Sequence, residues 1–304
     1  MRILVTGGAG FIGSHLVDAL LARGDDVAMA DHLHRGPKAW VEEALRRGVQ
    51  LHVVDVQDLS GVRRAFEASR PEVVLHLAAQ VDVRRSVADP AHDVQVNVAG
   101  TVSVLEAARE VGTRRVVIAS TAAVYGDPQQ IPTTEEAPIA PLSPYGTSKA
   151  AAEWYLAQYA RLYGISTLAL RMANVYGPRQ DPDRASGVVA IFSGLAARRG
   201  RATVFGDGHQ TRDYVFVEDV IDAWLTAADS DVIGALNVST GHETSLLEMT
   251  EALDLPFDFA PGRAGEIKRS CLDPSTAAAE LDWRAIVPLA CGLRRTLRTI
   301  QTPG

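Results

Sequence analysis

A glycine-rich turn directly after the first apolar run constrains the fold more than any other feature of the chain. The run Ile3–Thr6 predicts a buried strand, and the spacing of apolar residues over Phe11–Arg23 predicts an amphipathic helix. Gly7 permits a tight turn between them, Gly10 lets the backbone approach a pyrophosphate, and Gly13 lets the helix pack closely on the strand. Because the N–H groups at a helix start attract anions, this unit is predicted to bind a dinucleotide.

An acidic residue at the end of the second predicted strand indicates which dinucleotide to expect. Asp31 lies 18 residues beyond Gly13, where a carboxylate can accept both hydrogens of the adenosine ribose diol. This placement predicts NAD as the cofactor. His32 and Arg35 follow closely, so NADP stays open as the alternative.

Apolar runs that alternate with segments of helical period predict an α/β fold. The expected domain over residues 1–173 is a doubly wound parallel sheet of the Rossmann type, flanked by helices and built with right-handed crossovers. After about Asn174 the alternation breaks down, which predicts a smaller mixed substrate lobe over residues 174–304, with segments near 212–240 returning to the first domain. The predicted strands are Ile3–Thr6, Val27–Ala30, Leu51–Val54, Val73–Leu77, Val116–Ala119 and Thr167–Arg171.

The composition excludes several classes of partner. The 304 residues carry a net charge of −7, so we expect neither nucleic acid nor an anionic membrane surface as a partner. No apolar run reaches the roughly 18 residues of a membrane span. Two cysteines are too few to predict a disulfide framework. The histidines share no spacing typical of metal ligands, so no metal site is predicted. Since the first strand begins almost at the N-terminus, we expect no signal peptide and a cytoplasmic protein.

A tyrosine and a lysine four residues apart form the candidate catalytic pair. Tyr145 and Lys149 stand at the start of a predicted helix, so both side chains emerge on one face. A phenol with a pKa of ~10 is a poor base at neutral pH, but a nearby ammonium and an oxidised nicotinamide both favour the phenolate. The hydroxyl of Thr121, at the end of a predicted strand, can reach the same substrate oxygen. In isolation this spacing also arises from an aromatic side chain packed beside a solvated lysine.

These motifs, in this order, resemble the extended short-chain dehydrogenase/reductase family, above all its UDP-galactose (UDP-glucose) 4-epimerase branch. The stretches Leu170–Gln180 and Phe205–Tyr214 add to a resemblance that covers nearly the whole chain. It implies that Thr121 shares a hydrogen bond with the 4-oxygen of the sugar, that Tyr145 is the base and that Lys149 assists it. The residues that the motifs and the resemblance assign to the cofactor are Gly7, Gly10, Phe11, Ile12, Gly13, Asp31, Asp55, Val56, Leu77, Ala78, Ala79, Asn97, Tyr145 and Lys149.

The resemblance also separates the reactions open to such a site. Relatives that dehydrate or decarboxylate sugars carry a carboxylate in the positions just after the threonine, which are Ala122 and Ala123 in this chain. The implied reaction is therefore oxidation at carbon 4 by NAD, rotation of the transient 4-keto sugar, and return of the hydride to its opposite face. A nucleotide-sugar reductase or dehydratase of the same family is the alternative enzyme. A non-catalytic NAD-binding regulatory protein is the alternative from another class.

The same resemblance places a UDP-sugar in the second lobe. Asn174, Arg212 and Arg263 match positions that hold the diphosphate, for which arginine offers forked donors. Glu266 matches a carboxylate at the uridine ribose, and Ser270 occupies the position that controls space beside the 2-substituent of the sugar. Glucose and N-acetylglucosamine forms stay open, with a uronate as a less favoured third choice.

Relatives usually pair through helices that correspond to residues 94–110 and 145–163. We therefore expect a homodimer.

Overall fold

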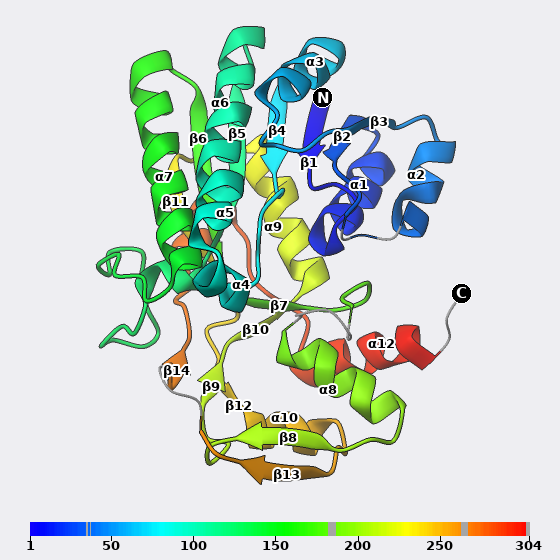
Figure 1. Ribbon diagram of the computed structural model, residues 1–304, viewed down its shortest axis with the longest axis vertical. Coiled ribbons are helices and arrows are strands. Elements are labelled where there is room, and N and C mark those ends of the chain that lie inside the picture. The colour runs from blue at the N-terminus through cyan, green and yellow to red at the C-terminus, as the bar shows by residue number, and fades with distance from the viewer. Residues whose placement is uncertain (35, 37, 182–186, 263–266, 302–304) are drawn as a thin grey trace.

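The computed structural model describes residues 1–34, 36, 38–181, 187–262 and 267–301. At its centre is a seven-stranded sheet, parallel throughout, in the order β11-β6-β5-β4-β1-β2-β3 (Figure 1). The predicted Rossmann-type α/β fold is confirmed. The strands are β1 (Arg2–Thr6), β2 (Asp26–Asp31), β3 (Gln50–Val53), β4 (Val73–His76), β5 (Arg115–Thr121), β6 (Ser166–Met172) and β11 (Gly234–Val238).

Helices cover both faces of the sheet, which explains why its central strands are continuously apolar. All four residues of β4 are buried. One core contains Leu16 and Trp224, and the other contains Phe66 and Leu105. The helices and helical turns of this part are α1 (Phe11–Arg23), η1 (Lys38–Val41), α2 (Glu42–Arg46), α3 (Leu59–Ser69), α4 (Val83–Ala88), α5 (Pro90–Val94), η2 (Gln95–Ala99), α6 (Gly100–Val111), η3 (Ala122–Tyr125), α7 (Pro144–Tyr163) and α9 (Val217–Asp229).

A smaller mixed part lies beyond the carboxyl ends of the sheet strands (Figure 1). It is built from three small sheets, in which β10 pairs with β7, β9 lies between β12 and β14, and β13 pairs with β8. Its elements are β7 (Asn174–Tyr176), α8 (Val188–Ala197), β8 (Ala202–Phe205), β9 (Thr211–Arg212), β10 (Tyr214–Phe216), β12 (Thr244–Ser245), α10 (Leu246–Ala252), β13 (Phe257–Ala260), β14 (Arg269–Ser270) and α12 (Leu289–Gln301). Helix α11 (Ser275–Leu281) packs instead against β11 and α9 of the first part.

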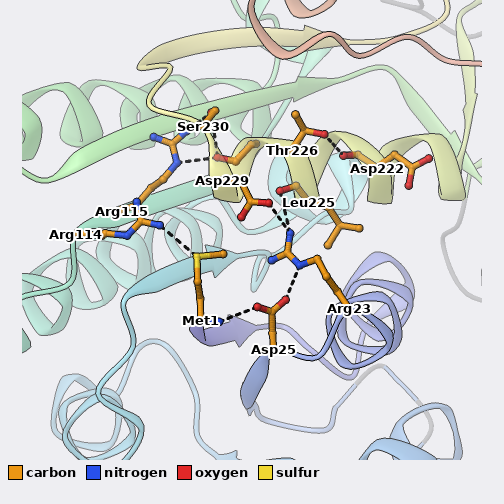
Figure 2. A network of polar contacts seen from close by, with 11 residues as sticks. Met1, Arg23, Asp25, Arg114, Arg115, Asp222, Leu225, Thr226, Asp229 and Ser230 are labelled. Carbon is orange, nitrogen blue, oxygen red and sulfur yellow. Dashed lines mark hydrogen bonds and ion pairs between the residues drawn. The ribbon is translucent and has the colours of Figure 1, made fainter.

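A polar network fixes α9 at the opposite edge of the sheet, around the N-terminus (Figure 2). The Arg23 guanidinium donates to Asp25 at 2.6 Å and to Asp229 at 2.8 Å, while the N-terminal amine of Met1 donates to Asp25 at 2.9 Å. Buried Arg115 donates to the carbonyl of Ala227 at 2.7 Å. These bonds hold a helix from late in the chain against α1 and the first strand.

None of the helices in the described residues is both long and apolar enough to cross a membrane.

Candidate active site

A cavity of about 1010 Å³ opens along the carboxyl ends of the central strands. Ligands bind at this edge of open α/β sheets because the loops and helix starts converge there. Most of the predicted site residues line it. They are Gly7, Gly10, Phe11, Ile12, Gly13, Asp31, Asp55, Val56, Leu77, Ala78, Ala79, Thr121, Tyr145, Lys149 and Asn174.

The glycine turn at one side of the cavity leaves no room for side chains. Gly7 has a φ of 70°, and a Cβ on it would lie 2.7 Å from the backbone nitrogen of Ala78. A Cβ on Gly13 would lie 2.1 Å from the carbonyl oxygen of Gly7. Gly10 is the N-cap of α1 and has no side chain to occupy the first-turn N–H groups. The turn is therefore shaped to let a diphosphate reach the helix start, as NAD requires.

Asp31 lies at the end of β2, buried, and faces the same cavity. Its carboxylate accepts from the backbone of Ala9 at 3.0 Å and of Leu33 at 2.7 Å. Burial alone would raise the pKa of this carboxyl, but hydrogen bonds from His32 and from the two backbone N–H groups outweigh it and lower the pKa. An ionised acceptor at this place fits a ribose diol and opposes a 2′-phosphate.

Thr121, Tyr145 and Lys149 come together at the other side of the cavity, where β5 ends and α7 begins. The Tyr145 phenol and the Thr121 hydroxyl line the same part of the cavity. Burial raises the pKa of the phenol to about 12, and the nearby Thr121 side chain opposes this rise. The Lys149 ammonium donates to the carbonyl of Ala119 at 3.0 Å. Burial lowers the pKa of Lys149 to about 8, against the opposing charge of Asp93. The phenol thus needs nearby positive charge to ionise, and the Lys149 ammonium lies one helical turn away.

The start of α7 sets the position of this pair. Ser143 is the N-cap, and Pro144 occupies the first turn, where its missing N–H is not needed. The backbone N–H of Tyr145 donates to the Ser86 hydroxyl at 3.1 Å. Because α7 begins at a fixed residue, Tyr145 and Lys149 both face the end of β5.

Asn97 does not line the cavity. It lies in η2 and is almost fully buried, with its amide nitrogen donating to the Gln80 carbonyl at 2.9 Å and to the Asp93 carboxylate at 3.1 Å. Its amide nitrogen also lies 3.2 Å from the Ser148 hydroxyl on α7. In this structure Asn97 joins the segment after β4 to α7.

Three of the predicted substrate residues lie on three different short strands. Asn174 begins β7 and lines the cavity, whereas Arg212 of β9 and Ser270 of β14 do not line it. Arg212 and Ser270 are direct partners in the parallel register of their strands. Arg263 and Glu266 lie outside the described residues.

Several residues that line the cavity were not predicted from the sequence. Trp40, Gln57, Arg85, His92 and Gln180 all lie on its wall. The first four stand in segments without a motif, and Gln180 ends the stretch Leu170–Gln180. Their position in the chain could have identified the first four residues. Each of them follows a predicted strand, and the segments that follow parallel strands lie at the carboxyl edge of the sheet, where ligands bind.

Comparisons with known proteins agree with the geometry. The family model of the NAD dependent epimerase/dehydratase family matches residues 3–239. A UDP-glucose 4-epimerase of Mycolicibacterium smegmatis is 47% identical over 98% of this chain and 97% of its own. The UDP-glucose 4-epimerase of Thermus thermophilus, solved in complex with NAD, is 42% identical with a TM-score of 0.92 and covers 100% of both chains. That of Thermotoga maritima, solved with UDP-glucose, is 39% identical with a TM-score of 0.92 over 98% of both chains.

The expected resemblance is confirmed: the chain belongs to the NAD-dependent epimerase/dehydratase family.

Proposed function

We propose that the protein catalyses the 4-epimerisation of a UDP-hexose, interconverting UDP-glucose and UDP-galactose, with bound NAD. One observation carries the proposal. A single cavity contains both the glycine turn with Asp31 and the group formed by Thr121, Tyr145 and Lys149. The relatives from three organisms that carry the name UDP-glucose 4-epimerase support the choice of reaction and sugar.

The chain holds the cofactor mainly with its backbone. In our proposal the N–H groups at the start of α1 bind the diphosphate, Asp31 binds the adenosine ribose, and Asp55 and Val56 flank the adenine. Leu77, Ala78, Ala79 and Asn97 complete the cofactor side, Asn97 through the segment that it anchors. When bound, NAD would accept a hydride from carbon 4 and return it to the opposite face of the 4-keto sugar.

Tyr145, Thr121 and Lys149 manage the proton at the 4-oxygen. The Tyr145 phenolic oxygen takes the proton of the 4-hydroxyl and later returns it, while the Thr121 hydroxyl hydrogen-bonds to the same oxygen. Lys149 supplies the positive charge that the buried phenol needs to ionise.

The wall near Thr121 argues against the alternative reactions. Ala122 and Ala123 follow it in η3, so in the described lining no carboxylate comes from the segment that dehydratases and decarboxylases use. A reductase would release its cofactor after each turnover. A regulatory protein would not need Thr121, Tyr145 and Lys149 together in one cavity.

The substrate side is assigned to the second lobe. We place the UDP diphosphate at Asn174, Arg212 and Arg263, its ribose at Glu266, and the sugar beside Ser270. We also propose that the chain is divided into an NAD-binding domain over 1–173 and a substrate lobe over 174–304. Segments near 212–240 belong to the NAD-binding domain.

The assembly is proposed to be a homodimer formed through α5, α6 and α7. Val94, Trp154, Leu162 and Tyr163 expose 48%, 61%, 61% and 50% of their surface on these helices or at their ends. Exposed apolar side chains on these helices favour a protein partner, and a second copy is the simplest one. We propose the cytoplasm as its location, in keeping with two free cysteines.

Proton NMR of the purified protein with NAD and, separately, UDP-glucose, UDP-N-acetylglucosamine and UDP-glucuronate tests the proposal. We expect the 4-epimer of UDP-glucose to appear without net loss of NAD. Accumulation of a keto product with reduced cofactor would indicate an enzyme that does not return the hydride. No change with any sugar would overturn the proposed reaction.

A further inference from the structure

Asp213 is a buried acid that lies between two substrate-side strands, β9 and β10, and belongs to neither. Only 1% of its surface is exposed. One carboxylate oxygen accepts from the backbone and hydroxyl of Thr240 at 3.0 and 2.6 Å. The other accepts from the backbone of Gly241 at 3.0 Å and lies 3.6 Å from the Cys271 thiol. The side chain therefore joins the segment after β11 to the segment after β14.

The main chain of the same residue reaches the proposed substrate residues. The Asp213 N–H donates to the carbonyl of Ser270 at 2.9 Å, and its carbonyl accepts from the N–H of Asn174 at 2.9 Å. Arg212 precedes it directly in the chain. One buried residue is thus bonded to two of the proposed substrate residues and covalently joined to a third.

The strands themselves are too short to fix these residues. β9 and β14 have two residues each and β7 has three, so each contributes very few ladder hydrogen bonds. The orientation of Arg212 and Ser270 then depends on contacts outside the strands. Among the described residues next to β7, β9 and β14, the Asp213 carboxylate is the acceptor with the most donors around it, four in all.

We infer that Asp213 is a positioning residue for the UDP-sugar: it holds Asn174, Arg212 and Ser270 in the geometry that binds the nucleotide sugar. The inference rests on the proposed function. Asp213 itself is buried behind the site and touches no reacting atom. A neutral amide in its place keeps the shape but turns an N–H₂ group toward N–H or O–H donors, which leaves hydrogen bonds unmade.

The test compares Asp213→Asn with Asp219→Asn as a matched control. Asp219 on α9 is also buried, with 2% of its surface exposed, and also accepts from two backbone N–H groups, those of Ile286 at 3.1 Å and Val287 at 3.0 Å. Unlike Asp213, it has no hydrogen bond to a proposed substrate residue among the described residues, where its carboxylate accepts only from Ile286 and Val287. Both variants should lower the melting temperature. We expect only Asp213→Asn to raise KM for UDP-glucose, by about tenfold, and to weaken UDP binding in calorimetry, with NAD affinity unchanged.

The outcomes separate the two proposals. If the wild-type protein binds neither UDP nor UDP-glucose, the proposed function fails. If it binds them and Asp213→Asn binds them equally well, or loses NAD together with UDP, the positioning role is wrong. Should Asp213→Asn not fold, Thr240→Val removes one donor and keeps the carboxylate. A smaller rise in KM without a change in NAD affinity is then expected, and an unchanged KM would overturn the inference.

Discussion

The two sides of the cavity are built in different ways. On the cofactor side, one turn over residues 7–13 and the ends of long sheet strands provide the wall, and backbone atoms make most of the proposed contacts. On the proposed substrate side, strands of two or three residues that contain positions 174, 212 and 270 meet around Asp213, and of these three positions Asn174 lines the cavity. A contiguous motif can specify the first side, whereas the second exists only after the chain has folded.

The largest effect is expected where the two sides meet, at Tyr145. Tyr145→Phe removes the proposed acid–base group and should lower kcat by about 10²- to 10⁴-fold, while bound NAD is retained. The assay is turnover of UDP-glucose, together with NAD content after denaturation. Tyr155→Phe, an exposed tyrosine on the same helix, is the control. Wild-type turnover in Tyr145→Phe would remove Tyr145 as the base.

A substitution in the glycine turn should damage the cofactor side alone. The Cβ of Gly13→Ala would lie 2.1 Å from the carbonyl of Gly7, so the turn must shift. We expect an unfolding free energy lower by about 1–3 kcal/mol. NAD binding should weaken by at least about tenfold, as the anion site is displaced.

The matched control for Gly13 is Gly24, which ends α1. At φ 90° a Cβ there meets no heavy atom within 4 Å, so Gly24→Ala introduces backbone strain only. It should lower stability and leave NAD affinity unchanged. Equal NAD affinities in both variants would contradict the close-packing role of Gly13.

A smaller effect is expected at Asp31, the proposed contact to the adenosine ribose. Asp31→Asn should raise the dissociation constant for NAD by about tenfold, or 1.4 kcal/mol, and reduce discrimination against NADP. The turnover at saturating NAD should change little. Calorimetric titration with both dinucleotides measures the effect, and Asp26→Asn at the exposed start of the same strand is the control. An unchanged preference between NAD and NADP would exclude Asp31 as the selecting residue.

The smallest effect concerns the pH dependence of stability through Lys149. Burial lowers its pKa to about 8, below that of the unfolded chain, so the unfolded state binds more protons between the two values. Stability therefore gains from this residue as the pH rises through that window, by about 1 kcal/mol between pH 8 and pH 9. Urea unfolding of the wild type and Lys149→Met should show this difference. Parallel pH profiles would mean that the lysine is not held in a buried site.

Much of the fold and part of the site could be predicted from the sequence. The six predicted strands occur within one or two residues of their expected bounds, and α1 spans Phe11–Arg23 as expected. The contacts of Asn97 could not be predicted in this way. Its order in the chain suggested a cofactor contact, but its amide is bonded to Gln80, Asp93 and Ser148, an arrangement that depends on how η2 packs against α7.

The sequence by itself determined what depends on local geometry. A strand, a glycine turn and a helix in succession define an anion site, and a spacing of four residues places Tyr145 and Lys149 on one helix face. Tertiary structure alone decided which distant segments meet: Thr121 with Tyr145, and Asn174 with Asp213 and Ser270. The physical reason is that short strands and buried hydrogen bonds form only when packing brings their partners together, and no pattern within one segment records that packing.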